Sequence, residues 1–277
     1  MKNNLLIIDL NNLLIVSISV RRAMHWKGKS TTGISGFLDL MCAYINKWEL
    51  TDIIVTLDSP PYKRRDLFPE YKLKNKSNLI EESKFKAINE GRKQIKELLD
   101  IMNISVLEYK GLEADDVIAE IVNNYHTKYD NLIIASGDSD LIQLLKRDNI
   151  IIQKTKDRLY TKEDFKKDFP DIKVEDWYKI LSIAGTHNNI KGISGIAIKT
   201  AVKNFKINEN YWKDMLMIYP ELNLYSKLIK LPYEKINDLE IKKPNFSTRN
   251  IEAYLRKNYG INLKLFALEA FSILEKI

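Results

Sequence analysis

Leu5-Leu-Ile-Ile8 is a short apolar run that leads directly into a carboxylate, Asp9. The same arrangement recurs where Ile53-Ile-Val-Thr-Leu57 leads into Asp58, and a third run, Leu132-Ile-Ile-Ala135, precedes a turn. Runs of this length, rich in β-branched residues and bounded by polar ones, are typical of buried strands in a parallel sheet. These segments therefore predict an α/β fold built on such a sheet.

Helical spacing of apolar residues separates the predicted strands, as in Gly36–Ile45 and 82–99. Strands that alternate with helices indicate a parallel sheet flanked by helices. Beyond about residue 164 the pattern is helical only. We therefore predict an α/β domain over residues 1–163, with a basic insertion that starts near residue 59, and a helical domain over residues 164–277.

Acidic residues gather where this sheet would bind a ligand, because open α/β sheets bind ligands beyond the carboxyl ends of their strands. Besides the two strand-end aspartates, Glu113, Asp115 and Asp116 open a predicted helix, and Asp138 and Asp140 follow the third apolar run. Converging carboxylates repel one another unless a cation intervenes, and hard divalent ions such as Mg²⁺ prefer oxygen ligands. The sequence therefore predicts a metal-dependent enzyme.

Each acidic motif also has a plainer interpretation. Carboxylates in the first turn of a helix are stabilised by the helix dipole, so Glu113, Asp115 and Asp116 are also compatible with a simple charged N-terminus. Asp138 and Asp140 are compatible with an Asp-rich turn that caps a helix. Three carboxylates in four residues exceed what capping requires, which favours the metal site.

The charge distribution indicates the substrate. The chain has 277 residues and a formal net charge of +7. Basic residues are concentrated between residues 60 and 80, at Lys63, Arg64, Arg65, Lys72, Lys74 and Lys76. A basic segment beside an acidic metal site suits a phosphodiester, since affinity for nucleic acid comes largely from phosphate neutralisation. A lysine-rich surface that only keeps the protein in solution is the alternative.

A glycine hairpin, Gly192-Ile-Ser-Gly195, lies within residues 189–201 between two predicted helices. Paired glycines allow the backbone to approach a phosphate, and the amides that open the next helix supply donors. Lys191 and Lys199 add positive charge. This pattern is typical of a helix–hairpin–helix module on a nucleic-acid backbone, the alternative being a turn between packed helices.

Cysteine usage and hydropathy bear on the compartment. Cys42 is the only cysteine, which excludes a disulfide framework and a thiolate metal site. No segment approaches the roughly 18 apolar residues of a membrane span. We expect a cytoplasmic protein.

The motifs together resemble the 5′-nuclease family, which includes bacterial and phage 5′–3′ exonucleases, flap endonucleases and the 5′-nuclease domain of DNA polymerase I. The resemblance runs in order from residue 5 to about residue 205. It rests on the strand-end aspartates, the segments 68–72, 111–119 and 136–141, and the glycine hairpin. It implies a PIN-like domain, a helical arch over about residues 59–95 that is threaded by a 5′ single strand, and a K⁺-assisted helix–hairpin–helix module that grips duplex DNA.

The resemblance also assigns roles to residues. The first metal site would consist of Asp9, Asp58, Glu113, Asp115 and Asp116, with Asp58 and Asp116 counted among the catalytic residues, and the second would consist of Asp138 and Asp140. Lys72 would contact the scissile phosphate. The remaining DNA contacts would come from Arg64, Arg65, Tyr71 and Lys76 in the arch and from Lys191, Gly192, Gly195 and Lys199 in the hairpin.

One departure from the family pattern lies just before the hairpin. The family usually has two further aspartates there, whereas this chain has Gly185-Thr186-His187-Asn188-Asn189, one residue shorter and with neither carboxylate. A site with so few anionic ligands is expected to bind Mg²⁺ weakly.

We therefore predict a Mg²⁺- or Mn²⁺-dependent 5′-nuclease acting on flapped, nicked or primer-bearing duplexes in DNA replication or repair. Two alternatives stay open: a structure-specific DNA-binding protein with impaired catalysis, and a PIN-type endoribonuclease. The sequence also leaves open the balance of exonuclease and endonuclease action, the preference for DNA or an RNA–DNA hybrid, and recruitment by a DNA polymerase or a single-strand-binding protein.

Overall fold

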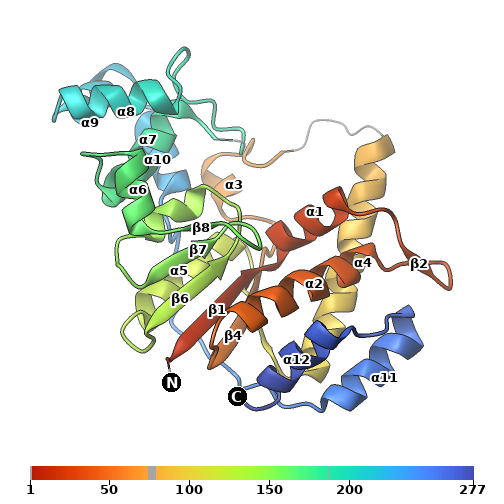
Figure 1. The fold of residues 1–277 in the computed structure, drawn as a ribbon. Helices are drawn as coiled ribbons and strands as arrows, with labels where there is room; N and C mark the ends of the chain where they lie inside the picture. The colour runs from red at the N-terminus through yellow and green to blue at the C-terminus, as the bar shows by residue number, and fades with distance from the viewer. Residues whose placement is uncertain (1, 74–78, 187) are drawn as a thin grey trace.

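The computed structural model of the chain describes residues 2–73, 79–186 and 188–277. Its centre is a six-stranded sheet in the order β5-β4-β1-β6-β7-β8 (Figure 1). All neighbouring strands are parallel except β7 and β8. The strands are β1 (Asn4–Asp9), β4 (Asp52–Leu57), β5 (Ser105–Glu108), β6 (Asn131–Ala135), β7 (Ile150–Gln153) and β8 (Leu159–Tyr160). The predicted α/β fold with a parallel sheet is confirmed.

Strand β1 is central and separates two hydrophobic cores. Leu5 and Ile7 point into one core, and Leu6 and Ile8 point into the other, as the alternation of side chains along a strand requires. All four side chains are fully buried. This explains why the sequence shows an unbroken apolar run instead of alternation: helices cover both faces of the sheet.

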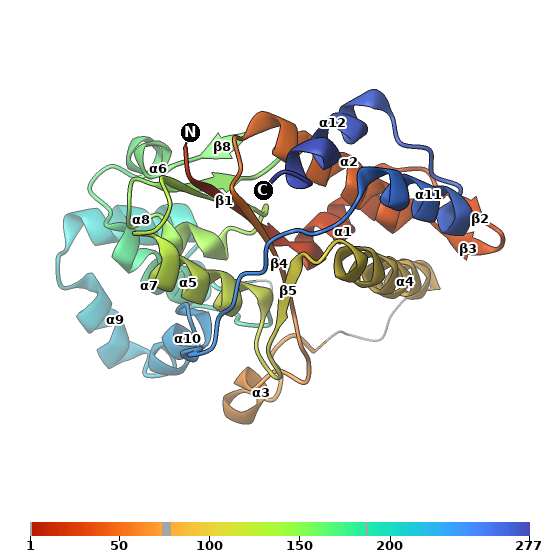
Figure 2. The same ribbon diagram turned by 90° about the horizontal axis from the view of Figure 1, so that it is seen from below.

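The two faces carry different helices (Figures 1 and 2). Helices α1 (Leu10–Val20), α2 (Thr32–Lys47) and α4 (Leu79–Ile101) pack together on one face. Helix α5 (Ala114–Tyr125) and the 3₁₀ helix η1 (Asp140–Leu144) lie on the other. Between α1 and α2 the chain forms a small hairpin, β2 (His25–Trp26) and β3 (Lys29–Ser30). None of the helices in the described ranges is long and apolar enough to cross a membrane.

A group of short helices extends the face that carries α5. It contains α6 (Lys162–Asp168), η2 (Val174–Asp176), α7 (Trp177–Ala184), α8 (Ile198–Ile207), α9 (Tyr211–Ile218) and α10 (Leu222–Ile229). The glycine hairpin lies between α7 and α8. The predicted change to a helical pattern after about residue 164 is therefore present in the structure.

The last two helices, α11 (Thr248–Tyr259) and α12 (Leu265–Leu274), lie far from that group and against the opposite face of the sheet (Figure 1). Phe271 and Leu274 are fully buried in the same core as Leu14 and Phe37. The prediction that residues 164–277 form one helical domain is wrong for this part, because the apolar faces of α11 and α12 complete the core around α2.

The predicted insertion after residue 59 contains one short helix, α3 (Arg64–Leu67), followed by a turn and then α4. Residues 74–78 lie outside the described part of the chain, and with them Lys74 and Lys76. Most side chains at the start of this segment are exposed or partly exposed, but two of them anchor it in the protein, since Arg64 is 1% and Tyr71 2% exposed. The predicted arch over residues 59–95 stays a prediction.

Candidate active site

The carboxyl ends of three adjacent strands bring the predicted acidic residues together. Asp9 ends β1 and caps α1 by accepting a hydrogen bond from the Asn12 amide at 3.1 Å. Its other oxygen accepts a hydrogen bond from the Ser136 hydroxyl, which follows β6, at 2.9 Å. Asp58, beyond β4, accepts from the Ala114 amide of α5 at 2.8 Å. The expected convergence of strand ends on the start of α5 is thus observed.

The first turn of α5 divides its three carboxylates between different environments. Glu113 and Asp116 are buried, whereas Asp115 is partly exposed. Asp116 accepts a hydrogen bond from the Glu113 amide at 3.1 Å, which closes the helix N-terminus in the manner of a capping box. The plainer capping interpretation of this motif is therefore correct for Asp116.

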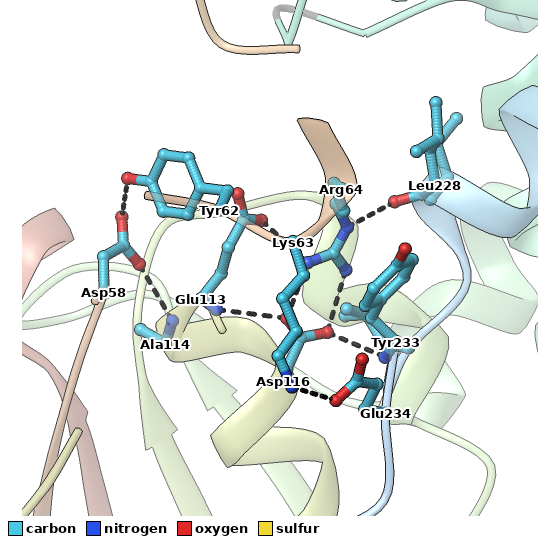
Figure 3. A network of polar contacts seen from close by, with 12 residues as sticks. Asp58, Tyr62, Lys63, Arg64, Glu113, Ala114, Asp116, Leu228, Tyr233 and Glu234 are labelled. Atoms are coloured by element: carbon cyan, nitrogen blue, oxygen red, sulfur yellow. Dashed lines mark hydrogen bonds and ion pairs between the residues drawn. The ribbon is translucent and has the colours of Figure 1, made fainter. Parts of the chain in front are cut away.

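Arg64 binds both oxygens of the Asp116 carboxylate (Figure 3). Its two terminal nitrogens donate to the two Asp116 oxygens at 2.6 and 2.8 Å, and its Nε donates to the Leu228 carbonyl at 2.7 Å. The Tyr233 amide also donates to Asp116 at 2.8 Å. Four protein donors thus saturate the two oxygens of Asp116, whereas each oxygen of Asp9 accepts only one hydrogen bond among the described residues. Asp116 is therefore not placed as a metal ligand, and the buried Arg64 is not placed to contact DNA, in contrast to both predictions.

Glu113 is held by a cation and a phenol. Lys72 Nζ lies 3.0 Å from its Oε1, and the Tyr71 hydroxyl donates to its Oε2 at 3.1 Å. Because Tyr71 is buried, it is not placed to contact DNA, in contrast to the prediction. Lys72 is half-buried, and its ammonium group also lies 5.2 Å from the centre of the Tyr62 ring. The predicted proximity of Lys72 to the acidic site is therefore present in the structure.

The turn after β6 supplies the last two aspartates. The Asp138 amide donates to the Ser136 hydroxyl at 3.1 Å, and the Asp140 amide donates to the Asp138 carboxylate at 2.8 Å. Asp138 is partly exposed, whereas Asp140 is buried at the start of η1. Ser136 thus bridges this turn to Asp9, a role that the sequence pattern did not reveal.

The electrostatics of the site disfavour a full set of negative charges. Burial, with the charges of Asp58 and Asp138 adding to it, raises the pKa of Asp9 to about 7. Burial and Asp138 also raise the pKa of Asp140 to about 7. The pKa of Asp115 is raised well above its ordinary value by burial, Asp138 and Asp9. These carboxylates therefore repel one another across the strand ends, and a nearby positive charge would relieve that repulsion.

Oxygen donors of this kind suit a hard divalent cation. Within the described ranges, however, no three acidic, histidine or cysteine side chains are close enough to form a ready metal cage. The candidate donors are Asp9 and the partly exposed Asp115 and Asp138, because the charge of Asp138 helps to raise the pKa of both Asp9 and Asp115. The donor chemistry fits a divalent ion, whereas Glu113 and Asp116 are committed to Lys72 and Arg64.

The glycine hairpin has one tightly packed and one open glycine. Gly192 has a φ of +63°, and a Cβ there would lie 2.3 Å from the Gly185 amide nitrogen. Gly195 has a φ of +80°, and a Cβ there would meet nothing within 4 Å. Gly195 therefore faces open space, as a backbone approach to a phosphate requires.

The start of α8 completes the hairpin. Ala197 precedes the helix and has no side chain to cap it, and Lys191 and Lys199 are both exposed. Uncapped first-turn amides beside two lysines suit an anion. On the other side of the hairpin, Asn188 is buried, and its side-chain oxygen has no partner among the described residues.

Solved structures share this architecture. Flap endonuclease-1 from Methanococcus jannaschii superposes with a TM-score of 0.67 at 20% identity, covering 99% of this chain and 92% of that one. A phage T5 flap endonuclease, solved in a complex with DNA and metal ions, superposes with a TM-score of 0.63 at 18% identity, covering 98% and 99% of the two chains. The parallel sheet with acidic strand ends is the PIN-like α/β nuclease fold.

Comparison with known sequences identifies the family more specifically than the fold does. Residues 4–170 match the family model described as the 5′-3′ exonuclease, N-terminal resolvase-like domain. A 5′-3′ exonuclease of Aquifex aeolicus is 31% identical over 242 residues, which is 80% of each chain. This chain belongs to the 5′–3′ exonuclease family.

Proposed function

We propose that this chain is a metal-dependent 5′-nuclease that hydrolyses phosphodiesters at 5′ flaps, nicks or RNA primers in DNA. The observation that supports the proposal is the convergence of carboxylates at the strand ends. Asp9, Asp58 and Asp138 follow three adjacent strands and lie near Asp115 on α5, and Lys72 lies beside them. A cationic side chain at the edge of an acidic crevice suits a substrate that carries a negative phosphate to a metal site.

The residues of the site and of the glycine hairpin would have different roles in the reaction. Asp9, Asp115 and Asp138 would hold Mg²⁺ or Mn²⁺, which when bound would activate a water and stabilise the leaving oxygen. Lys72 would exchange Glu113 for the scissile phosphate and neutralise its developing charge. The amides at Gly195 and the start of α8, with Lys191 and Lys199, would hold the duplex backbone, and K⁺ is proposed to assist there.

The test is cleavage of a 5′-flap, a nicked duplex and an RNA-primed duplex with Mg²⁺ or Mn²⁺, against the same reactions in EDTA. Asp115→Asn is expected to abolish cleavage while duplex binding persists, because Asp115 is partly exposed and makes none of the structural bonds of Asp116. Asp39→Asn is the control, since Asp39 pairs with Arg21 outside the site and its loss is expected to leave cleavage intact.

Two other functions would give different results. A DNA-binding protein with impaired catalysis is favoured by Asn188, which stands where the family usually has an aspartate, and would bind the flap without cleaving it at any metal concentration. A PIN-type endoribonuclease would cleave single-stranded RNA and would show no preference for a duplex. Either result would overturn the proposed 5′-nuclease.

A further inference from the structure

The turn over residues 70–73 has an unusual set of hydrogen bonds. Its four consecutive carbonyls all accept from side chains, and among the described residues two side chains supply these donors. Arg65 donates from Nε to the Tyr71 carbonyl at 2.9 Å and from Nη2 to the Lys72 carbonyl at 3.1 Å. Asn189 donates from Nδ2 to the carbonyls of Glu70 and Leu73 at 2.7 and 2.8 Å.

This turn holds Lys72 in a backbone conformation that lysine avoids. Its φ is +49°, in the left-handed region, which is unfavourable for a residue with a Cβ. The Lys72 amide donates to the Asn188 carbonyl at 3.3 Å, so the loop before the glycine hairpin contacts the turn through its backbone as well. In this conformation the side chain of Lys72 reaches Glu113.

The loop that presents Asn189 is itself well anchored. The Thr186 amide donates to the Ile190 carbonyl at 2.8 Å, and the Ile193 amide donates to the Ile183 carbonyl at 2.7 Å. Gly185 and Gly192 pack against each other with no room for a Cβ. Asn189 is thus a fixed donor that projects from the base of the hairpin to the turn that carries Lys72.

We infer that Asn189 is a positioning residue for the chemical step: it holds the 70–73 turn so that Lys72 points into the acidic site. This inference rests on the proposed nuclease function. It assigns a role to a residue on the duplex-binding side of the molecule whose own side chain does not reach the carboxylates. Arg65 is its partner in the same task, instead of a DNA contact as the sequence had suggested.

A purely structural clamp would behave differently from a positioning residue. Asn189 is exposed, so the loss of its side chain removes little burial and is expected to leave global stability nearly unchanged. A small displacement of a charged group that acts on the transition state, in contrast, slows the reaction strongly. The saturating rate and the stability therefore separate the two roles.

The test uses Asn189→Gly, because Asn189 has a φ of +66° and glycine adopts that conformation without strain. Asn103→Gly is the matched control. Asn103 also has a positive φ, +53°, is also exposed, and also donates from Nδ2 to a distant carbonyl, that of Lys243, at 2.9 Å. The full-length variants are compared on a 5′-flap substrate with Mn²⁺, with enzyme in excess.

We expect Asn189→Gly to lower the single-turnover rate at saturating enzyme by about tenfold to a hundredfold. Its Kd for the duplex and its unfolding midpoint should match those of Asn103→Gly. In a Lys72→Ala background, Asn189→Gly should cause less than a twofold further loss, because residues that act through one another are not additive.

Three results would overturn the inference. The first is a saturating rate of Asn189→Gly equal to that of the wild type. The second is a loss confined to Kd, which would make Asn189 a DNA-binding residue. The third is a full additional loss in the Lys72→Ala background. Absence of cleavage by the wild type itself would instead refute the proposed function, so the two failures are distinguishable.

Discussion

Arg64 and Asp116 form a buried ion pair with two parallel hydrogen bonds, and their side chains are 2% and 0% exposed. Arg64 comes from α3, and Asp116 comes from the first turn of α5, so the pair joins two segments that are 52 residues apart. The Leu228 carbonyl and the Tyr233 amide bind the same two side chains (Figure 3). The pair therefore connects α3 and α5 with α10 and the chain that follows it.

Arg64→Met is expected to destabilise the protein by about 3–5 kcal/mol, because it leaves the Asp116 charge buried without its partner. Urea unfolding with tryptophan fluorescence measures the change. Arg21→Met is the control: the Arg21–Asp39 pair is 30% and 44% exposed, and its loss is expected to cost less than about 1 kcal/mol. Equal unfolding midpoints for the two variants would contradict the structural role of Arg64.

Stability without metal is expected to depend on Asp9. Its pKa is about 7 in the folded protein, against an ordinary value of 3.8. Between these two pH values the carboxyl group of Asp9 is protonated in the folded state and ionised in the unfolded state. The contribution of Asp9 to the free energy of unfolding therefore falls as the pH rises from about 4 to about 7. In EDTA, Asp9→Asn should raise the free energy of unfolding at pH 8 by roughly 1–3 kcal/mol, and by less at pH 5.

Asparagine keeps the cap of α1, since it accepts the Asn12 amide nearly as well as aspartate does. The measurement is urea unfolding at the two pH values, with Asp39→Asn as the control that should show no such gain. A loss of stability in Asp9→Asn at pH 8 would show that the carboxylate is stabilised by its surroundings instead of being repelled.

Lys72→Ala is expected to lower the single-turnover rate at saturating enzyme by about 100-fold, because a positioned cation stabilises charge that develops in the transition state. Lys199→Ala, on the exposed start of α8, should instead weaken duplex affinity and lower the slope of log affinity against log salt by about 1. Single-turnover rates and salt titrations of both variants make the comparison. A loss of affinity alone in Lys72→Ala would refute its catalytic role.

The two hairpin glycines are expected to respond differently to alanine. Gly192→Ala should destabilise the fold, because its Cβ would collide with the backbone at Gly185. Gly195→Ala has space for its Cβ and carries only the cost of a positive φ, about 1–2 kcal/mol. Its methyl group would point to where a phosphate is proposed to lie, so duplex affinity should fall. Melting temperature and fluorescence anisotropy with a labelled duplex measure the two effects.

The sequence predicted the sheet and the acidic strand ends because both depend on local patterns. The runs before Asp9 and Asp58 show the strands, and parallel topology then brings their ends together. The helices at 36–45 and 82–99 also follow from spacing, and the structure has α2 and α4 there. The strand pair β7–β8 and helices α9 and α10 were not predicted, since their segments are short.

The sequence could not predict which charged residues pair with one another. Arg64 and Arg65 are adjacent and look alike in a basic segment, yet one is buried against Asp116 and the other binds the carbonyls of a turn. Their partners lie in α5 and in the turn over residues 70–73, and the chain's path in space, not local spacing, decides which arginine meets which partner. The same holds for Asn189. Its inferred role depends on contact with Glu70 and Leu73, which precede it in the sequence by 119 and 116 residues.

The return of the chain's end to α2 has a consequence for its synthesis. A ribosome makes the α/β segment first, but α12 covers α2 only when residues 265–274 have left the exit tunnel. Until then the apolar side chains of α2 that pack against α12 are exposed to water. The nascent domain is thus incomplete until α12 has emerged, and a chain that ends before residue 265 would be a natural target for chaperones and proteases.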